Sequence, residues 1–357
     1  MQPGILEQVV RTRAYAAMSA TAPLLPYRID RRDPGPHDAV IDIRYCGVCH
    51  TDIHQVRDQW GGSKFPMVPG HEIVGTVVRV GDQVERWRVG DTVGVGCIAD
   101  SCRECESCRA GEEQFCERGF IPTYNGYERD GLTPTYGGYS MQITMDEAYI
   151  VSIPAGLPLV GATPLLCAGI SVYSPLRRLG AKPGESIGVV GLGGLGHIAV
   201  KVSRAMGLRV AVLSHSAGKR YDALRLGADE FLTTCNGQVF DKNAGRFDYI
   251  MDTVSMRHDY DPYLNLLRRD GTMTLLGLPE PGAVAAASLI RRRCRLTGSL
   301  IGGLRETQEM LTFCAQHGIW SETELIPIQE INEAYNRIVQ GDVRYRFVID
   351  ISSFERS

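Results

Sequence analysis

The chain has 357 residues, of which 44% are hydrophobic and 22% are charged, a composition typical of a globular protein with about two domains. The formal net charge of −3 gives no electrostatic reason to expect nucleic acid or an anionic membrane as a partner. Nowhere do about 18 consecutive apolar residues occur, so we predict no membrane-spanning helix.

The ends and the charged runs of the chain add little to this description. Residues 1–17 lack the cationic start and apolar core of a signal peptide, so we expect a cytoplasmic protein. The basic run at 291–295 is interpreted as a solvated strand edge or turn. In a reducing compartment the clustered cysteines of the chain indicate metal ligands rather than disulfides.

The first part of the chain is predicted to be rich in β-strands. Alternating apolar and polar residues at 39–45, 72–81 and 84–96 indicate strands, and Pro, Gly and Asp turns separate them. The segment 343–350 near the C-terminus has the same character. The chain is therefore expected to return to this β-rich domain at its end.

After about residue 155 the pattern changes to strands that alternate with helices. Residues 186–216 combine an apolar strand, a glycine-rich turn, an amphipathic helix and a second strand, which together make a βαβ unit. The apolar segments 247–255 and 271–279 indicate further buried parallel strands. The sequence therefore predicts a doubly wound α/β domain inserted into the β-rich one.

A cysteine-rich lobe lies between the predicted strands of the first domain. Cys102, Cys105, Cys108 and Cys116 have the spacing C-x2-C-x2-C-x7-C. Four thiolates suit a closed tetrahedral zinc site, which leaves no coordination position for a substrate and is therefore structural. An iron–sulfur cluster uses the same ligands and remains an alternative, as do four cysteines without a metal.

A second set of possible ligands is scattered along the chain. The stretch "CGVCHTDIH" contains Cys46 and Cys49, "VPGHE" contains His71 and Glu72, and "LLCAG" contains Cys167. Two cysteines and a histidine with one open position form a known type of catalytic zinc site. Spacing does not decide between the first two cysteines, nor whether the last is more than a buried core cysteine.

A glycine-rich turn predicts a dinucleotide site. Gly191, Gly193 and Gly196 form G-x-G-x-x-G after an apolar strand and at the start of a helix, the context that this motif requires. Such glycines let backbone N–H groups approach a pyrophosphate, and the helix N-terminus favours its negative charge.

The end of the second strand predicts which cofactor binds. An NAD site carries Asp or Glu there to bind the ribose 2′-hydroxyl, but this strand ends at Ser214, followed by His215, Ser216, Lys219 and Arg220. Hydroxyls and cations can hold a 2′-phosphate, which a carboxylate would repel. We therefore predict NADP(H); the alternative is that Ser214 only ends the strand.

Taken together, these motifs resemble the zinc-dependent medium-chain alcohol dehydrogenases. With "GDTVGVGC", "GGYS", "GSLIGG" and "DVRYRFVID", the similarity narrows to the cinnamyl-alcohol-dehydrogenase-like branch and its bacterial NADPH-dependent aldehyde reductases. The resemblance implies a GroES-like β-rich catalytic domain at 1–160 and 305–357, with the zinc lobe at about 97–120. A Rossmann domain with a doubly wound parallel sheet would occupy 161–304.

The resemblance also assigns the catalytic metal ligands. It implies that Cys49, His71 and Cys167 bind the catalytic zinc, that Glu72 is a neighbour able to approach it, and that Cys46 is a packed core residue.

Other residues of the opening stretch receive different roles from the resemblance. Thr51 would bond the substrate oxygen and pass a proton, and His54 would form the solvent end of that relay. Asp52 would orient His71, and His50 would lie near the cofactor pyrophosphate. A turn without any role is the alternative for both histidines.

The resemblance implies further contacts to the cofactor and to the substrate. The additional cofactor-binding positions are Gly194, Leu195, Thr253, Gly277, Ser299 and Ile301. The expected substrate pocket is lined by Gln55, Trp60, Cys97 and Leu300, with Trp60 alternatively a structural aromatic residue. Pro122 and Leu300 depart from residues common in lignin-pathway enzymes, which favours a broad range of aldehydes.

The function implied is the NADPH-dependent, reversible reduction of aromatic and aliphatic aldehydes to primary alcohols. Two zinc ions per chain, one catalytic and one structural, and a homodimer are expected, with no nucleic acid or membrane partner. A C=C or iminium reductase of the same family, and a non-catalytic NADPH-binding protein, are the alternatives. The presence of Thr51, His54 and the full ligand set argues against both.

Overall fold

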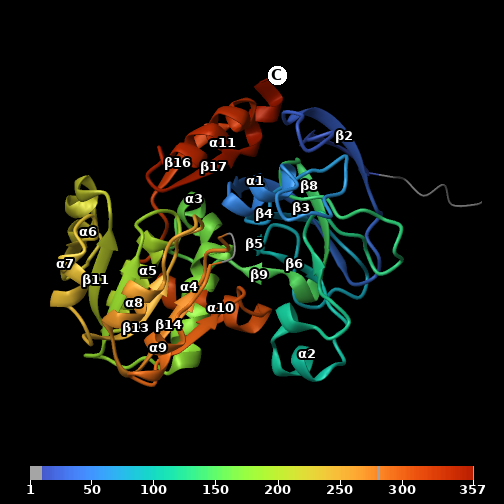
Figure 1. Cartoon of the computed structure of the whole chain (residues 1–357). Coiled ribbons are helices and arrows are strands. Elements are labelled where there is room, and N and C mark those ends of the chain that lie inside the picture. The colour runs from blue at the N-terminus through green and yellow to red at the C-terminus, as the bar shows by residue number, and fades with distance from the viewer. Residues whose placement is uncertain (1–9, 280–281, 357) are drawn as a thin grey trace, which may run out of the picture. The chain divides into compact units, whose positions relative to one another are not determined.

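The computed structural model describes residues 10–279 and 282–356, which form two compact units (Figure 1). Unit 1 contains the chain up to Cys167, Gly303–Ala315 and the residues from Trp320 onward, and unit 2 contains Ala168–Gly302 and Gln316–Ile319. The boundaries between the two units thus lie a few residues away from the domain boundaries expected from the sequence. Most of the N-terminal stretch used to argue against a signal peptide lies outside the described residues.

Unit 1 is built on a mixed sheet whose strands come from both ends of the chain. In spatial order its strands are β16 (Thr323–Pro327), β17 (Arg346–Asp350), β3 (Asp38–Gly47), β4 (Ile73–Val80), β5 (Thr92–Val95) and β9 (Val151–Ser152), with β8 (Gln142–Asp146) also paired to β3. Strands β17 and β3 pair antiparallel. The predicted return of the C-terminal segment to the β-rich domain is therefore confirmed.

The remaining elements of unit 1 surround this sheet. Two further two-stranded sheets are formed by β1 (Val10–Ala16) with β2 (Leu25–Arg31) and by β6 (Ile98–Asp100) with β7 (Ile121–Pro122). The helices are α1 (His50–Val56), α2 (Glu106–Ala110), α3 (Leu159–Ala162), most of α10 (Leu304–His317) and α11 (Ile331–Gln340). Apolar side chains of β3 and β4, such as Ile41, Ile73 and Val77, are fully buried and make the core.

Unit 2 is the doubly wound domain that the sequence predicts. Its sheet has the order β12 (Glu230–Thr233), β11 (Arg209–Ser214), β10 (Ser186–Val190), β13 (Phe247–Asp252), β14 (Leu267–Leu275) and β15 (Arg295–Gly298). Each neighbouring pair is parallel. The chain order 3-2-1-4-5-6 reverses between β10 and β13, where such folds bind ligands beyond the carboxyl ends of the strands.

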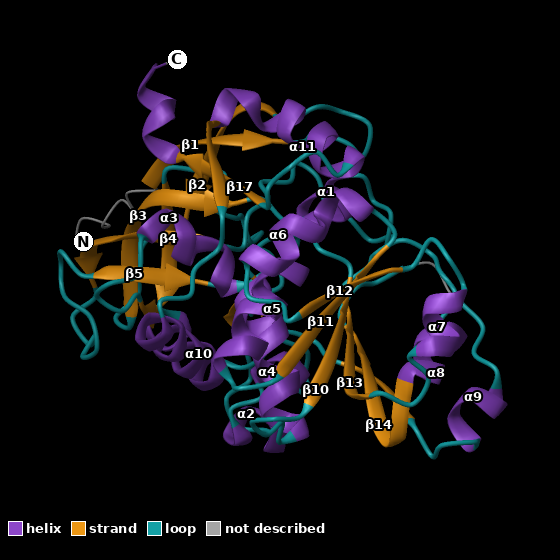
Figure 2. Ribbon diagram, turned by 90° about the vertical axis from the view of Figure 1, so that its left-hand side faces the viewer, coloured by secondary structure: helices purple, strands orange, loops and turns teal. Residues whose placement is uncertain are grey.

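Helices cover both faces of the unit 2 sheet. They are α4 (Ala168–Leu179), α5 (Gly196–Ala205), α6 (Arg220–Arg225), α7 (Gln238–Lys242), α8 (Asp261–Leu266) and α9 (Ala286–Ile290). Figure 2 shows the strands fanned out with α4 and α5 on one side and α7 and α8 on the other. Phe247, Leu264 and Met273 belong to the buried core beneath α8. This covering explains why the strands are continuous apolar runs.

Of two local predictions, one is partly wrong and the other agrees with the structure. The strand expected over 84–96 is wrong in its first half, because only β5 (Thr92–Val95) forms. Gly90 has a φ of 98°, and the Asp91 carboxylate accepts a hydrogen bond from the Arg88 N–H, so the chain turns there instead. The basic run at 291–295 does form a turn that leads into β15.

One observation bears on membranes. Within residues 10–279 and 282–356, no single helix has both the length and the apolar composition to cross a bilayer, although the bent pair Leu159–Leu166 and Ala168–Leu179 would meet both criteria if taken together.

Candidate functional site

Asp52 organises the start of α1 in unit 1. The helix begins after Cys49, and one carboxylate oxygen of Asp52 accepts a hydrogen bond from the Cys49 backbone N–H at 2.8 Å. A carboxylate in the first turn satisfies a backbone donor that the helix leaves unpaired and complements the helix dipole. The Asp52 side chain is fully buried, so this local helix signal also places a carboxyl group inside the protein.

The same carboxylate orients His71. Its other oxygen lies 3.1 Å from Nδ1 of His71 and 3.2 Å from the Gly70 backbone nitrogen. An ionised carboxylate only accepts, so Nδ1 carries a proton, and in the neutral ring Nε2 holds the lone pair. Nε2 is buried and has no hydrogen-bond partner among the described residues. A buried, bare imidazole nitrogen is the form in which histidine binds a metal.

A tight turn places His71 at this point. Gly70 has a φ of 104°, and a Cβ on it would lie 2.7 Å from Sγ of Cys46 and 2.8 Å from the ring of Tyr139. Only glycine fits both the backbone conformation and the space. Cys46 itself is fully buried and lies outside the ligand cluster, which agrees with the packing role expected for it.

Cys49, His71, Glu72 and Cys167 converge in one buried cluster. One donor atom of each lies within 4.8 Å of the donor atoms of the others, although the last residue is more than ninety positions from the others in sequence. A hydrogen bond from Cys167, opposed by burial, lowers the pKa of the Cys49 thiol well below its usual value. Two sulfurs and a bare imidazole nitrogen match the chemistry of a catalytic zinc site with an open position.

Glu72 has a partner that the sequence did not indicate. Arg346 on β17 donates a hydrogen bond to one carboxylate oxygen of Glu72, and both side chains are buried. The second oxygen, Oε2, is buried without a partner in the described part of the chain. Burial raises the pKa of Glu72 to about 7 against the opposing effect of Arg346. Glu72 can therefore change its charge beside the cluster near neutral pH.

Cys97, expected in the substrate pocket, lies next to the same cluster. Its thiol hydrogen-bonds to Cys167, and this bond, opposed by burial, lowers the pKa of Cys97. The structure therefore places a third thiol beside the two that are candidate ligands.

The residues predicted for proton transfer follow Cys49 on α1. Thr51 lies on the first turn of the helix and His54 on its last turn. Nδ1 of His54 is 2.5 Å from Oε1 of Gln59, and the ring stacks on Trp60 with centroids 4.7 Å apart. Trp60, expected in the substrate pocket, thus contacts a histidine of the predicted relay.

Two other residues of this region also have defined positions. His50 begins α1, and its ring centroid is 6.0 Å from that of His54. The side-chain oxygen of Gln55 accepts a hydrogen bond from the amide of Asn125. Gln55 is thus held toward a loop of unit 1, a contact that no motif in the sequence indicates.

Three tyrosines pack around Asp52 and His71, and no motif in the sequence singles them out. The Tyr139 hydroxyl lies 3.4 Å from Asp52, the Tyr335 hydroxyl lies 3.5 Å from that of Tyr139, and the Tyr124 ring stacks on His71 at 5.8 Å. Burial raises the pKa of all three phenols well above the usual value. They therefore remain neutral beside the carboxylate.

The cysteine lobe forms the second cluster of unit 1. Donor atoms of Cys102, Cys105, Cys108 and Cys116 all lie within 4.8 Å of one another, and none of these cysteines is in a disulfide. Backbone N–H groups of the lobe point at its sulfurs over distances of 3.3 to 3.4 Å. Four sulfurs that converge in this way fit a closed tetrahedral zinc site.

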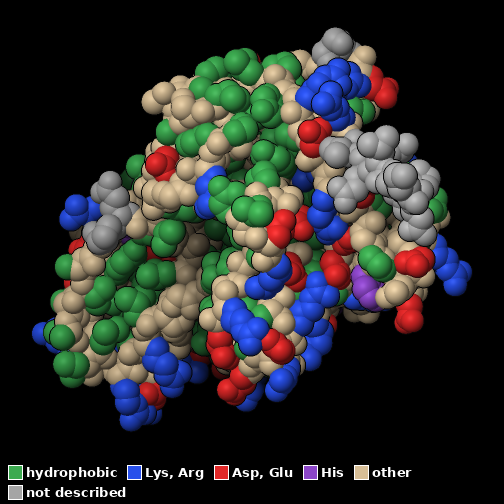
Figure 3. Space-filling view, turned by 90° about the vertical axis from the view of Figure 1, so that its right-hand side faces the viewer, with side chains coloured by type: hydrophobic (Ala, Val, Ile, Leu, Met, Phe, Trp, Pro, Cys, Tyr) green, Lys and Arg blue, Asp and Glu red, His purple; other side chains and the backbone are tan. Residues whose placement is uncertain are grey.

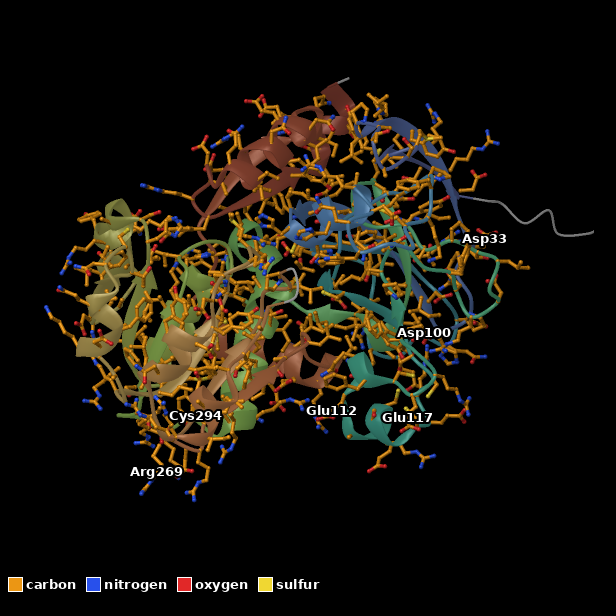
Figure 4. All side chains as sticks on the ribbon, viewed as in Figure 1. Asp33, Asp100, Glu112, Glu117, Arg269 and Cys294 are labelled. Carbon is orange, nitrogen blue, oxygen red and sulfur yellow. The ribbon has the colours of Figure 1, made fainter. Side chains whose placement is uncertain are left out.

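Most of the exposed side chains of the lobe are charged. Figure 4 labels Asp100, Glu112 and Glu117 near α2, and the lower centre of the face drawn in Figure 3 carries interspersed acidic and basic groups. Arg103 bridges Asp100 and Asp146, and Arg118 pairs with Glu104. Exposed pairs of this kind stabilise little, so the lobe needs another source of stability.

The glycine-rich turn of unit 2 has the expected context. It joins β10 to α5, Gly191 has a φ of 86°, and a Cβ on Gly196 would collide with the backbone oxygen of Gly191. A Cβ on Gly193 would meet nothing within 4 Å, which leaves room above the turn. Gly194 and Leu195 complete the turn before the helix. Helix α5 therefore begins directly after a close-packed turn, so its N-terminal backbone N–H groups are placed as in an anion-binding site.

The end of β11 carries the residues predicted to select the cofactor. Ser214 is buried at the last position of the strand, and its Oγ accepts from the Ser216 backbone N–H at 3.2 Å. The Lys219 amine lies 3.0 Å from the backbone oxygen of Leu192 in the glycine-rich turn. The backbone oxygen of His215 accepts from the exposed thiol of Cys235. Lys219 thus lies against the glycine-rich turn, and no carboxylate occurs from 214 to 220.

The remaining predicted cofactor positions follow the next strands of unit 2. Thr253 donates its hydroxyl to the Val190 carbonyl at 2.7 Å, and a Cβ on Gly277 would collide with the Val254 backbone oxygen. Ser299 donates its N–H to Leu275. Leu300 is 47% exposed and Ile301 has a positive φ. These residues lie after the carboxyl ends of β13, β14 and β15.

Comparison with known proteins settles the family. Two family models match, the alcohol dehydrogenase GroES-like domain over residues 35–155 and the zinc-binding dehydrogenase over residues 194–316. The NADP-dependent alcohol dehydrogenase C 1 of Mycolicibacterium smegmatis is 55% identical over 342 residues, which cover 95% of this chain and 98% of that protein. The chain belongs to the zinc-binding alcohol dehydrogenases.

Two further relatives extend this similarity. The aldehyde reductase YahK of Escherichia coli is 50% identical over 344 residues, which cover 96% of this chain and 98% of that protein. The structure of a cinnamyl alcohol dehydrogenase from Sorghum bicolor superposes with a TM-score of 0.93 at 42% identity, covering 96% of this chain and 98% of that chain. The predicted family and its GroES-like and Rossmann fold are therefore confirmed.

Proposed function

We propose that this zinc-binding dehydrogenase catalyses the reversible, NADPH-dependent reduction of aromatic and aliphatic aldehydes to primary alcohols. The observation that carries the proposal is the buried cluster of Cys49, His71 and Cys167 with the bare Nε2 of His71 directed by Asp52. A non-catalytic protein would have no use for such a cluster. The relatives named as NADP-dependent alcohol dehydrogenase and as aldehyde reductase support the same reaction.

Each residue of unit 1 would contribute a separate task to this reaction. Bound zinc would polarise the substrate oxygen, and bound NADPH would supply the hydride. Cys49, His71 and Cys167 would hold the metal, and Asp52 would fix the tautomer of His71 through the Nδ1 hydrogen bond. The hydroxyl of Thr51 can both donate and accept, so it would deliver the proton to the substrate oxygen.

Two groups would manage charge during turnover. The imidazole of His54 would accept the proton and pass it to solvent, because an imidazole can both accept and donate. Glu72 can neutralise itself or remain paired with Arg346, since burial raises its pKa to about 7. The chain would therefore adjust the negative charge around the metal without moving its backbone.

Unit 2 would select NADPH over NADH. The serine hydroxyl at the end of β11 and the nearby Lys219 offer a donor and a cation to a 2′-phosphate. The 2′-hydroxyl of NADH has no charge for this cation to attract, and no Asp or Glu is present at 214–220 to bind that hydroxyl instead. The Gly191–Gly196 turn would approach the pyrophosphate.

The decisive experiment combines metal analysis with initial rates of benzaldehyde reduction by NADPH and by NADH. We expect about two zinc ions per chain and a strong preference for NADPH. A Cys167→Ser variant should retain about one zinc and lose turnover. Full turnover in this variant would contradict the proposed site. Turnover only with an activated C=C substrate would favour a C=C reductase of the same family. NADPH binding without turnover of any of these substrates would favour a non-catalytic protein.

We further infer that the enzyme works as a homodimer in the cytoplasm. Strand β15 forms one end of the unit 2 sheet, and an open edge of this kind can pair with a second copy. The two clusters of thiols are compatible with a reducing compartment. Sedimentation of the purified protein would test the dimer directly, and a monomer at micromolar concentration would contradict it.

A further inference from the structure

The start of α10 is attached to the cysteine lobe, and both belong to unit 1. The backbone N–H of Leu304, the first residue of the helix, donates to the carboxylate of Glu113 at 3.0 Å. The guanidinium of Arg305 donates to the carbonyl of Ala110, the last residue of α2, at 2.8 Å. The stretch 110–113 of the lobe therefore holds the beginning of a helix that is almost two hundred positions away in sequence.

Helix α10 has no capping side chain of its own. The carbonyl of Gly303 accepts from the Thr307 N–H at 2.9 Å, which makes Gly303 the residue at the N-cap. Ser, Thr, Asp and Asn are preferred there, because their side chains accept from a free N–H of the first turn. A Cβ on Gly303 would collide with the backbone oxygen of Gly111, so no side chain fits. The Glu113 carboxylate thus supplies the acceptor that the helix lacks.

The residues directly before α10 are among those expected to contact the cofactor. Ser299 donates its N–H to the Leu275 carbonyl of unit 2 at 3.2 Å. Ile301 has a φ of 35°, in the left-handed region that β-branched residues rarely adopt. Such a conformation persists only when the surrounding structure enforces it. Ile301 lies between two anchors, one at Ser299 and the other at Leu304.

We propose that Glu113 is a positioning residue, which caps α10 and so holds the segment 299–303 in the conformation that binds NADPH. The proposal rests on the proposed function, because it takes this segment as part of the NADPH site. Cys108 and Cys116 flank the stretch 110–113, so the metal that gathers their thiols also fixes the anchor. The lobe therefore contributes to cofactor affinity in addition to its own folding.

The rest of α10 has other attachments, so the effect of Glu113 is local. Gln308, one turn further along, exchanges hydrogen bonds with the backbone of Ser152 on β9 at 2.8 and 3.2 Å. Met310 and Leu311 are fully buried. Loss of the Glu113 carboxylate would therefore free the first turn of the helix and the segment before it, while the helix itself stays in place.

Hydrogen exchange of the zinc-loaded protein without cofactor tests the anchor. Glu113→Met removes the acceptor, so peptides that cover 299–308 should exchange at least about threefold faster than in the wild type. Glu113→Gln keeps an acceptor and should exchange like the wild type. Glu117→Met is the matched control, because Glu117 is an exposed carboxylate of the same lobe, labelled in Figure 4. Unchanged exchange in Glu113→Met would overturn the proposal.

Fluorescence titration with NADPH tests the coupling to the cofactor. The Kd should rise about fivefold in Glu113→Met, with about two zinc ions per chain retained, and should not change in Glu113→Gln or Glu117→Met. Arg305→Met alters an exposed side chain, so it should fold normally and raise the Kd about twofold. Faster exchange with an unchanged Kd in Glu113→Met and Arg305→Met would overturn the proposal. Equal Kd values in Glu113→Gln and Glu113→Met, both above that of the wild type, would do the same.

Steady-state rates separate this inference from the proposed function. In Glu113→Met the KM for NADPH should rise with the Kd, by more than kcat or the KM for benzaldehyde changes. A purely structural role would lower thermal stability and leave the KM for NADPH unchanged, which would contradict the positioning. NADPH binding that depends on Glu113 in a protein without aldehyde turnover would contradict the proposed function alone. Normal turnover with the same Kd in all variants would contradict the positioning alone.

Discussion

Arg346 donates a hydrogen bond to the carboxylate of Glu72, and both side chains are buried although they are 274 positions apart in sequence. Strand β17 carries the arginine, and the turn before β4 carries the glutamate. The guanidinium is therefore the counter-charge for a cluster that contains thiols and a carboxylate. Its removal would leave the buried Glu72 either charged without compensation or forced to bind a proton.

Replacement of Arg346 by Met should destabilise the protein strongly. Removing one partner of a buried ion pair costs about 3–5 kcal/mol when the other group stays charged, so the comparison is made above about pH 7, where Glu72 is ionised in the wild type. Urea unfolding monitored by fluorescence would measure the loss. The double variant Arg346→Met/Glu72→Gln should recover part of it, since the uncompensated charge is then absent. A double variant that is less stable than Arg346→Met would contradict the pairing.

The stability of the metal-free protein should depend on pH through Glu72. Burial, opposed by Arg346, raises the pKa of Glu72 from 4.5 to about 7 in the folded protein. The folded state thus binds this proton more tightly than the unfolded chain does. The stabilisation is fully present below about pH 4.5 and is lost as the pH rises through about 7.

Glu72→Gln provides the comparison for this pH dependence. The free energy of unfolding of the metal-free wild type, taken relative to that of the variant, should fall by about 3 kcal/mol between about pH 4.5 and 7. Urea titrations across this range would measure both proteins. If the difference in unfolding free energy between the two proteins does not change with pH, or grows with pH, the pKa of Glu72 is not raised on folding.

Asp52→Asn should weaken metal binding more than it weakens folding. The carboxylate fixes the Nδ1–H tautomer of His71, and groups that orient a ligating histidine contribute about 10–100-fold to metal affinity. Competition with a chromophoric zinc chelator would measure the change. Asp42→Asn is a suitable control, because Asp42 is exposed and contacts Gln142. Equal zinc affinity in the two variants would contradict the role of Asp52.

Cys105→Ser should damage folding rather than chemistry. Most exposed side chains of the lobe are charged, so we expect a metal held by its four thiols to be the main source of its stability. We expect zinc content to fall from about two to about one per chain and the midpoint of thermal unfolding to decrease. Cys235→Ser, at an exposed cysteine outside both clusters, should change neither. A stable, soluble Cys105→Ser protein without turnover would mean that the lobe takes part in the reaction.

Ser214→Asp should shift the cofactor preference toward NADH. The new carboxylate would repel a 2′-phosphate and could accept from a 2′-hydroxyl. The ratio of kcat/KM with NADPH to that with NADH should fall at least about tenfold, which corresponds to about 1.4 kcal/mol. Ser288→Asp adds the same charge on α9 and should leave the ratio unchanged. An unchanged ratio in Ser214→Asp would contradict the assignment of this strand end.

The sequence predicted the kinds of residues at each site better than their partners. Thiols and imidazoles are rare enough that Cys49, His71 and Cys167 could be selected by residue type and by resemblance. Arg346 could not, because an arginine in a strand has no distinctive spacing and its partner lies far away in the chain. Gln59 was missed for a different reason, since only the folding back of the chain onto His54 gives that amide an orientation.

The fold was predictable where periodicity is strong. The βαβ unit at 186–216 combines an apolar strand, glycines and an amphipathic helix, and each part appears at its expected place. The strand expected at 84–96 failed because alternation alone does not reveal a turn at Gly90. The short pairs β6–β7 and β8–β3 were equally hidden, since their stability depends on neighbours that are distant in sequence.

The pairing of β3 with β17 also fixes an order of events on the ribosome. Unit 2 is made almost entirely of one continuous stretch, so it can fold as soon as that stretch has been synthesised. Unit 1 cannot complete its sheet until the last strand has emerged, because β17 pairs with β3 and β16 pairs with β17. Until that moment Glu72 has no counter-charge. The inserted domain is therefore expected to mature first during translation, and the candidate catalytic metal site should be the last part of the protein to assemble.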